Sequence, residues 1–257
     1  MSYVLIDKKK EYAVVTLCRD KANVLNAAMV TEIRRVFKEL SQDQTVRGVV
    51  LTGQPDFFSA GLDVIELFDY DKAEIKEFFI SFLTMFKEMV SFPKPMVAAI
   101  SGHSPAGGCV MALSADYRIM ADGPKYVIGL NEVAVNILIA DMIPIVYSFW
   151  IGHRKAHQYL LEGRLLSVQE ALDVGLIDEA LPADEVLPKA ETYLSKILQA
   201  NQDILEGTKA ALRRELIERM DMDLENYADQ NMSIWWDPEV RSRMAFFVET
   251  LKARKKK

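Results

Sequence analysis

The sequence has few of the residues from which disulfide frameworks and metal centres are built. Its 257 residues include only two cysteines, Cys18 and Cys109, and three histidines, His103, His153 and His157. Two cysteines are too few for a disulfide framework or a cysteine-based zinc site. His153 and His157 lack the glutamate that stands between the histidines of an H-E-x-x-H zinc motif. We therefore expect no metal site, and chemistry that depends on carboxylates and backbone groups.

Long apolar runs and targeting signals are also missing. No uninterrupted apolar run reaches the roughly 18 to 20 residues that a helix needs to span a bilayer. The N-terminal sequence MSYVLIDKKKEY has neither the apolar core of a signal peptide nor the Arg- and Ser-rich composition of a transit peptide. We therefore expect a cytoplasmic protein with no membrane partner.

Positive charge is in slight deficit. The chain has 31 basic and 37 acidic residues, a net charge of −6, which argues against binding to a nucleic-acid backbone. The one basic cluster is at the C-terminal end, where it is typical of a solvated terminus: Lys252, Arg254, Lys255, Lys256 and Lys257. We therefore expect no nucleic-acid partner.

What the sequence does contain is the pattern of an α/β protein. Half of its residues are apolar, which is enough for a sizeable core. Short β-branched runs alternate with stretches of helical periodicity, which indicates a sheet packed against helices. The predicted strands are Tyr12–Leu17, Arg47–Thr52, Met96–Ser101, Tyr117–Met120 and Tyr126–Gly129, and the predicted helices between them are Ala27–Leu40 and Ile75–Val90.

The second part of the chain is predicted to be mostly helical. Ser167 and Glu170 form a capping-box pattern, and Asp237-Pro238 has a cap residue before a first-turn proline. We divide the chain into an α/β core, residues 1–197, and a helical segment, residues 198–257. Large apolar side chains gather in Tyr227–Phe247, where they can form internal core or an oligomer interface.

Two loops carry the strongest functional pattern. Phe57–Asp63 (FFSAGLD) and Gly102–Cys109 (GHSPAGGC) each follow a predicted buried strand and end in small residues that open a helix. Small residues allow close approach, and a helix start offers unpaired N–H groups. Two such groups that converge would form an oxyanion hole, which stabilises negative charge on a carbonyl oxygen. The alternative is that both loops are merely tight turns.

The residues in and after these loops resemble the crotonase superfamily of enoyl-CoA hydratases and isomerases. The similarity spans about residues 3 to 185, and the run Gly107–Glu132 is most similar to the mitochondrial-type 3,2-trans-enoyl-CoA isomerases. The resemblance implies an α/β spiral of ββα units followed by a C-terminal helical oligomerisation segment. The motifs that carry it are Phe58–Asp63, Pro105–Cys109, Asp116–Ile119, Ile128–Glu132, Ile151–Arg154 and Glu170–Ile177.

The resemblance also implies roles for individual residues. Ala60 and Gly107 match the two residues whose backbone N–H groups form the oxyanion hole. Glu132 matches the catalytic carboxylate of the isomerases, with Asn131 beside it as a substrate contact. The segment that lines the pocket for the CoA thioester and adenine corresponds to Ala60, Gly61, Leu62, Asp63 and Val64.

One position separates two activities of this family. Hydratases have a second glutamate where this chain has Val110, which cannot transfer a proton. Moving a double bond needs one base, which takes a proton from C2 and returns it to C4 through a dienolate. We therefore expect an enoyl-CoA isomerase of unsaturated fatty-acid β-oxidation. The alternatives are a 2-enoyl-CoA hydratase or another acyl-CoA lyase or hydrolase, and, more remotely, an RNA-binding relative.

The resemblance further implies that the chain self-associates as a homotrimer or hexamer. It implies no cofactor, because the CoA thioester is part of the substrate.

Five further residues receive separate interpretations. His103 is expected to pack its loop, and Asp63 to cap a helix. Asn136 and Ile139 stand where the family usually has glycine and proline, which leaves the acyl specificity open. Asp141 is either a solvent-facing helix residue or an additional acid at the site.

Overall fold

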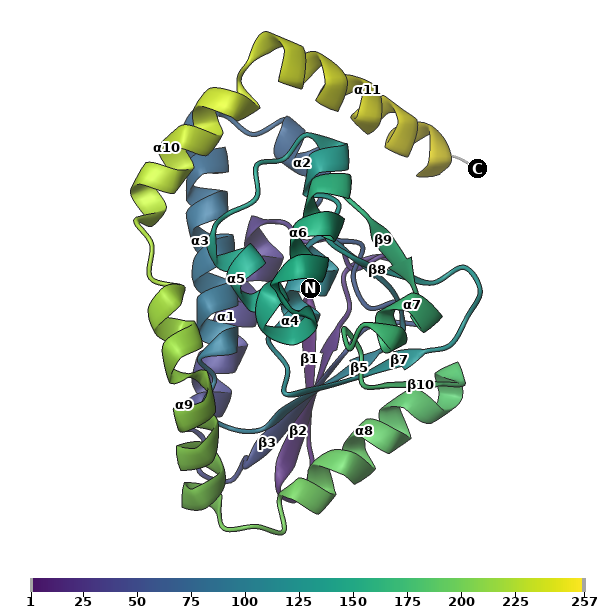
Figure 1. Ribbon diagram of the computed structural model, residues 1–257, viewed down its shortest axis with the longest axis vertical. Coiled ribbons are helices and arrows are strands. Elements are labelled where there is room, and N and C mark those ends of the chain that lie inside the picture. Colours follow the sequence, from purple (N-terminus) through teal and green to yellow (C-terminus); the bar gives the residue numbers. More distant parts are fainter. Residues whose placement is uncertain (1, 256–257) are drawn as a thin grey trace.

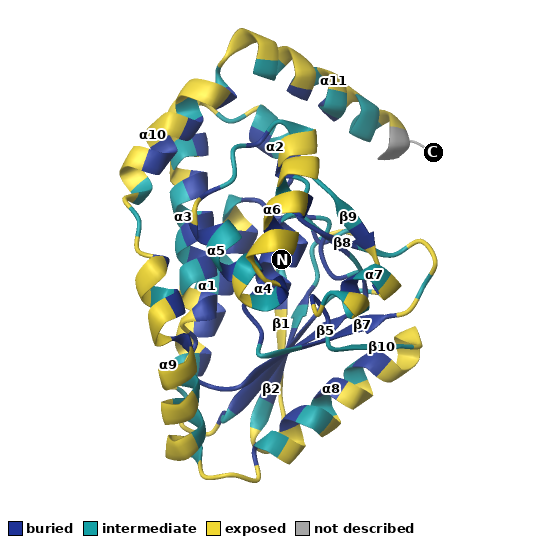
Figure 2. Ribbon diagram, in the orientation of Figure 1, coloured by how far each residue is buried: buried dark blue, intermediate teal, exposed yellow. Residues whose placement is uncertain are grey.

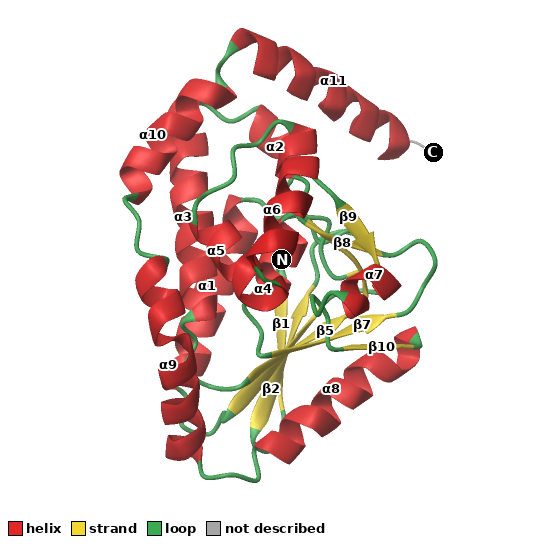
Figure 3. Cartoon of the chain, in the orientation of Figure 1, coloured by secondary structure: helices red, strands yellow, loops and turns green. Residues whose placement is uncertain are grey.

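The computed structural model describes residues 2–255, so Lys256 and Lys257 of the basic end lie outside the described residues. Figures 1 and 3 show the arrangement of the helices and strands. The strands are β1 (Val4–Lys8), β2 (Tyr12–Leu17), β3 (Gly48–Thr52), β4 (Asp56–Phe57), β5 (Met96–Ile100), β6 (Gly102–Pro105), β7 (Tyr117–Ala121), β8 (Val127–Gly129), β9 (Leu165–Ser167) and β10 (Glu179–Leu181). The helices are α1 (Ala27–Gln42), α2 (Val64–Phe68), α3 (Lys72–Val90), α4 (Gly107–Leu113), the 3₁₀ helix η1 (Glu132–Val135), α5 (Met142–Ile151), α6 (His153–Glu162), α7 (Val168–Asp173), α8 (Ala183–Ile197), α9 (Gln202–Arg219), α10 (Leu224–Trp235) and α11 (Pro238–Lys255).

The larger sheet has six strands in the order β1-β2-β3-β5-β7-β10. The strands from β2 to β10 are parallel to their neighbours, and only β1 is antiparallel. Parallel sheets are normally covered on both faces, and accordingly every residue of β3 and β5 is buried. One cover is α8, whose Val186, Ala190 and Leu194 share a buried cluster with Val50 of β3. The predicted α/β class is therefore confirmed.

The smaller sheet, in the order β4-β6-β8-β9, holds the two loops of interest side by side. Strand β6 pairs in parallel with β4 and with β8. The sequence predicted a loop at Gly102–Pro105. This prediction was wrong, because these four residues form strand β6. These four residues have no apolar alternation, and their strand partners come from distant parts of the chain.

Most of the other predicted elements are confirmed. Strand β2 has the predicted bounds, and helix α3 ends at the predicted residue, Val90. Ser167 and Glu170 form the predicted capping box. The Asp237 side chain accepts bonds from the N–H groups of Glu239 and Val240, as expected of a helix cap. Strands β1, β4, β9 and β10 were not predicted.

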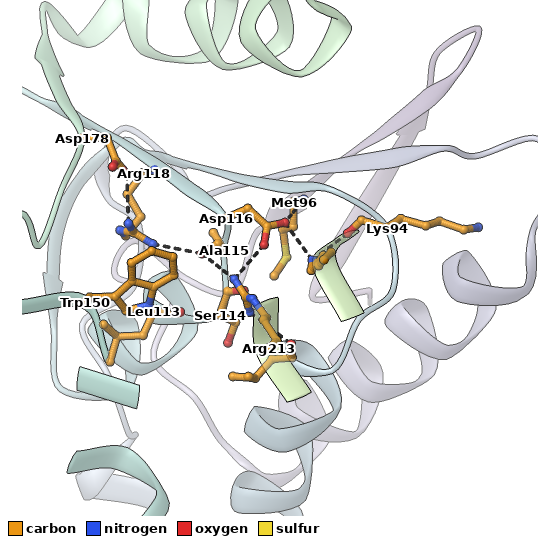
Figure 4. Close-up of polar contacts among 12 residues, drawn as sticks. Lys94, Met96, Leu113, Ser114, Ala115, Asp116, Arg118, Trp150, Asp178 and Arg213 are labelled. Atoms are coloured by element: carbon orange, nitrogen blue, oxygen red, sulfur yellow. Dashed lines mark hydrogen bonds and ion pairs between the residues drawn. The ribbon is translucent and has the colours of Figure 1, made fainter. Parts of the chain in front are cut away.

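A buried ionic cluster fastens α9 to the sheet (Figure 4). Arg213 of α9 donates to the carboxylate of Asp116 at 2.7 Å and to the carbonyl oxygen of Ser114 at 2.8 Å. Lys209, one turn earlier, lies 2.7 Å from the other Asp116 oxygen. Arg118 pairs with Asp178 at 3.0 Å, so the Asp116-Tyr-Arg118 motif forms three partly buried ion pairs. The cluster joins the helical segment to the α/β core.

The apolar residues near the C-terminus pack largely within the chain. In Figure 1, α10 lies along α3 and α11 crosses near α2, and both pairs are in contact. Trp235 is buried, with its ring 5.6 Å from that of Phe79. Met244 is also buried, whereas Phe246 is 78% exposed, so this face of α11 has no cover from its own chain. Figure 2 shows the exposed outer surfaces of α9, α10 and α11.

In the described part of the chain, no helix combines the length and the apolar character needed to cross a bilayer.

Candidate active site

The pairing of β4 with β6 brings the two loops into contact. Phe57 lies opposite His103 in the parallel register, and the N–H of Phe58 donates to the His103 carbonyl oxygen at 3.0 Å. Gly61 has a φ of +86°, and a Cβ there would lie 3.1 Å from the backbone nitrogen of Gly107. A side chain at position 61 would therefore be strained and would push the loops apart.

The backbone donors in the first loop differ from those expected. The N–H of Ala60 donates to the carbonyl oxygen of Ala22 at 2.8 Å, so it is not free to bind a ligand. The prediction that Ala60 is an oxyanion-hole donor is therefore wrong. Sequence reasoning missed this hydrogen bond because its acceptor, Ala22, belongs to a segment distant in the chain.

The N–H of Leu62 is available instead. Leu25 and Leu62 form an isolated β-bridge, in which the Leu25 N–H donates to the Gly61 carbonyl oxygen and the Asp63 N–H donates to the Leu25 carbonyl oxygen. The N–H of Leu62 itself takes no part in the bridge and points away from Leu25. Within residues 2–255, neither the Leu62 N–H nor the Gly107 N–H has a hydrogen-bond acceptor. Gly107 opens α4, where first-turn N–H groups have no partner in the helix.

The second loop is strained where it meets the strand that leads to Glu132. Ala106 has a φ of 48°, which is unfavourable for a residue with a side chain and is typical of functional sites. Its N–H donates to the carbonyl oxygen of Gly129 at 2.8 Å. This bond joins the turn before α4 to the end of β8, three residues before Glu132.

Glu132 is a buried carboxyl group without a partner. It begins η1 and is 8% exposed, and its Oε2 atom accepts no hydrogen bond in the described structure. Burial raises the pKa of Glu132 to about 7. The Oδ1 atom of the neighbouring Asn131 is also buried and without a partner. Unpaired buried polar groups are costly, and they are typical of sites that bind or transform a ligand.

These groups meet in one cavity of about 860 Å³. Of the residues that the resemblance pointed to, Gly61 does not line the cavity; it lies against Ala106. Those that do are Ala60, Leu62, Asp63, Val64, Gly107, Asn131 and Glu132. Sequence reasoning missed several other lining residues, including Asp20 and Lys21 near the entrance and Phe79, Phe82 and Tyr227 within, because no local motif marks them.

Two residues with open interpretations have structural roles here. His103 stacks on Phe57 at 5.1 Å and meets the edge of Tyr126 at 5.2 Å, away from the cavity lining. Asp63 caps α2 by accepting the Glu66 N–H, and it pairs with Arg19 at 2.8 Å. The packing role of His103 and the capping role of Asp63 are therefore confirmed.

The departures from the family pattern lie in and after η1. Asn136 ends η1 with a φ of 60°, a conformation that asparagine tolerates, and Ile139 lines the cavity. Asp141 is exposed before α5 and does not line the cavity, so it faces solvent. Val110 is fully buried in α4 and does not line the cavity either.

The fold and the cavity together are those of the crotonase class: a largely parallel sheet, two touching loops with free N–H groups, and C-terminal helices that contribute to the cavity lining. A family model for enoyl-CoA hydratase/isomerase matches residues 7–257. The chain belongs to this enoyl-CoA hydratase/isomerase family.

Its relatives include both isomerases and hydratases. The chain is 35% identical to mitochondrial enoyl-CoA delta isomerase 1 of Mus musculus, over 95% of this chain and 84% of that protein. It is 31% identical to a probable enoyl-CoA hydratase of Mycobacterium leprae, over 82% of this chain and 81% of that protein. The crystal structure of human mitochondrial delta3-delta2-enoyl-CoA isomerase is similar, with a TM-score of 0.94 at 30% identity, covering 98% of this chain and 99% of that one.

Proposed function

We propose that this protein is an enoyl-CoA isomerase that moves a cis or trans double bond from the 3 position of an acyl-CoA to the trans 2 position, in the breakdown of unsaturated fatty acids. The observation that carries the proposal is Glu132, a buried carboxyl group with a pKa of about 7 and a free Oε2 atom in the cavity. Such a pKa suits a group that acts first as base and then as acid.

The reaction begins with proton removal from C2 of the 3-enoyl thioester by the Glu132 carboxylate. The electrons of the C2–H bond move into the C1–C2 bond and onto the thioester oxygen, which gives a dienolate. Protonated Glu132 then returns the proton to C4, and the double bond is left between C2 and C3. No atom is gained or lost, so one carboxyl group is sufficient.

The negative charge on the thioester oxygen needs hydrogen-bond donors. Leu62 and Gly107 offer free N–H groups from loops that touch, and we assign the oxyanion hole to this pair in place of Ala60 and Gly107. Preorganised donors of this kind stabilise the charge in the transition state. Asn131 is assigned to contact the substrate beside Glu132.

The other carboxylates of the cavity are less suited to this chemistry. Asp63 is held by Arg19 and by the start of α2, and Asp20 is exposed at the entrance. Val110 supplies no second acid near Gly107. Adding water to a 2-enoyl thioester uses two carboxylates in this family, so this arrangement favours isomerisation over hydration.

The test is incubation with 3-cis-, 3-trans- and 2-trans-enoyl-CoA substrates and identification of the products. The expected result is 2-trans-enoyl-CoA from both 3-enoyl substrates and much slower formation of 3-hydroxyacyl-CoA. Faster hydration of the 2-enoyl substrate than isomerisation of the 3-enoyl substrates would overturn the proposal in favour of a hydratase.

We also propose that the chain assembles as a homotrimer or a hexamer. Phe149 of α5, Leu212 of α9 and Phe246 of α11 are large apolar side chains that remain 46%, 70% and 78% exposed. Their burial between subunits would contribute about 1.5–3 kcal/mol for each fully buried side chain. Light scattering at micromolar concentration is expected to report three or six subunits, and a stable active monomer would overturn the proposal. A cytoplasmic location stays a prediction from the N-terminal sequence.

A further inference from the structure

The cavity extends from an exposed entrance to a buried apolar end. Asp20 and Lys21 line the entrance and are exposed. We call the buried end of the lining the four residues Phe79 and Phe82 of α3, Ile143 of α5 and Tyr227 of α10, all of which are buried. In Figure 1, α10 lies along α3, so a C-terminal helix of the same chain supplies part of this end. Its lining is suited to a hydrocarbon chain.

Tyr227 of this end is held by a hydrogen bond. Its hydroxyl group donates to the carbonyl oxygen of Leu138 at 2.8 Å, and Leu138 itself lines the cavity in the loop after η1. The bond fixes the ring and satisfies the only polar atom of the side chain. Burial and then the charge of Glu132 raise the pKa of the Tyr227 hydroxyl group, which therefore stays protonated as the donor to Leu138.

The size of the cavity bears on the acyl group that it can hold. The cavity volume of about 860 Å³ is near the top of the usual range of about 300–1,000 Å³ for ligand sites. An acyl chain that enters past Glu132 gains favourable burial with each CH₂ group until it meets a fixed wall. The aromatic ring of Tyr227, anchored to Leu138, is such a wall.

We infer, on the basis of the proposed function, that Tyr227 sets the longest acyl chain that the cavity accepts. Tyr227 is a specificity-determining residue in this assignment and takes no part in proton transfer. Its ring stops the chain end, while its hydroxyl group keeps the ring and the Leu138 segment in place.

The experiment measures binding of saturated acyl-CoAs, from butanoyl- to tetradecanoyl-CoA, by titration calorimetry. For the wild-type chain, Kd should fall by up to about fourfold for each added CH₂ group that is buried. The improvement should stop, or reverse, once the chain reaches Tyr227. Saturated thioesters cannot be isomerised, so this result does not depend on the proposed reaction. The kcat/KM values for 3-enoyl-CoAs of the same lengths give a second readout.

Three variants at one position and one control sharpen the test. In Tyr227→Val the acyl length with the lowest Kd is expected to be longer than in the wild-type chain. In Tyr227→Trp it is expected to be shorter. Tyr227→Phe keeps the ring but loses the bond to Leu138, so it should move the length limit less than Tyr227→Val does. Phe86→Val removes a buried aromatic ring of α3 that does not line the cavity, so it controls for general loosening of the core.

Two outcomes would overturn the inference. One is a wild-type Kd that does not depend on acyl length. The other is a limit that stays the same in Tyr227→Val and Tyr227→Trp, or that moves equally in Phe86→Val. If Tyr227→Val fails to fold, Tyr227→Trp alone tests the inference, through the expected shift of the limit to shorter acyl chains. Normal length dependence of binding without any isomerisation would instead reject the proposed function and leave the inference about acyl binding standing.

Discussion

The guanidinium group of Arg213 lies 2.7 Å from the carboxylate of Asp116, although 97 residues separate the two in the chain. Arg213 also donates to the carbonyl oxygens of Val90, Ser114 and Ala115. These acceptors stand at the end of α3 and in the turn after α4, so one side chain of α9 holds together two helices that both contribute residues to the cavity.

Arg213→Ala is therefore expected to destabilise the fold. Removing one partner of a buried ion pair costs about 3–5 kcal/mol, and the lower end applies because Asp116 is partly exposed and keeps Lys209. Urea unfolding followed by circular dichroism would measure the loss. The exposed neighbour Arg214→Ala is the control and should change the unfolding free energy by less than about 0.5 kcal/mol. Equal stability of the two variants would contradict the anchoring role.

Glu132→Gln is expected to abolish isomerisation and to preserve acyl-CoA binding. The amide keeps the size of the side chain but cannot accept the C2 proton. Removal of a general acid–base group costs about 10²–10⁴-fold in rate. Asp141→Asn, which changes an exposed carboxylate outside the cavity, should behave like the wild-type chain. Activity of Glu132→Gln within a few fold of wild type would reject Glu132 as the base.

The pH dependence of activity should report the ionisation of Glu132. The base must be ionised to start the reaction, and burial raises the pKa of this carboxyl group to about 7. We expect kcat/KM to be constant above pH 8 and to fall about tenfold for each pH unit well below 7. An ordinary glutamate would give full activity down to about pH 5. Binding of a saturated acyl-CoA over the same range controls for other ionisations.

The same raised pKa has a consequence for stability. The folded-state pKa of Glu132 is about 7 and the ordinary value is 4.5, so its carboxyl group favours folding fully below pH 4.5. This contribution is lost as the pH rises through 7, when the buried group ionises at a cost of about 3 kcal/mol. Glu132→Gln has no such cost. Between pH 4.5 and pH 8, the unfolding free energy of the wild-type chain should therefore fall by about 3 kcal/mol relative to that of the variant. A constant difference across this range would contradict the raised pKa.

Val110→Glu is expected to increase water addition to 2-enoyl-CoA. The new carboxyl group would stand where hydratases of the family have their second glutamate. The gain should be smaller than the 10²–10⁴-fold of a well-placed acid–base group, since Val110 is fully buried and outside the cavity lining. Val110→Gln, which adds the same bulk without a carboxylate, is the matched control. An equal hydration rate in both variants would show that position 110 does not separate the activities.

Much of the fold and of the candidate site could be predicted from local patterns. The β-branched runs marked the central strands, since a strand buried on both faces must be apolar whatever packs on it. The small residues of the two loops indicated backbone donors, whereas Glu132 was assigned from the family resemblance. Asp63 was predicted as a helix cap because a cap bond joins residues close in the chain.

Only the tertiary structure decided which donors are free and where the cavity ends. Ala60 and Leu62 are equally plausible by spacing, but the carbonyl oxygen of Ala22 occupies the Ala60 N–H and leaves that of Leu62 open. Tyr227 faces the cavity because α10 packs along α3. The sequence alone determined the chemical groups and the local turns that present them. Hydrogen-bond satisfaction and the shape of the cavity depend on atoms brought together from distant segments, so they were set by the packing of the whole chain.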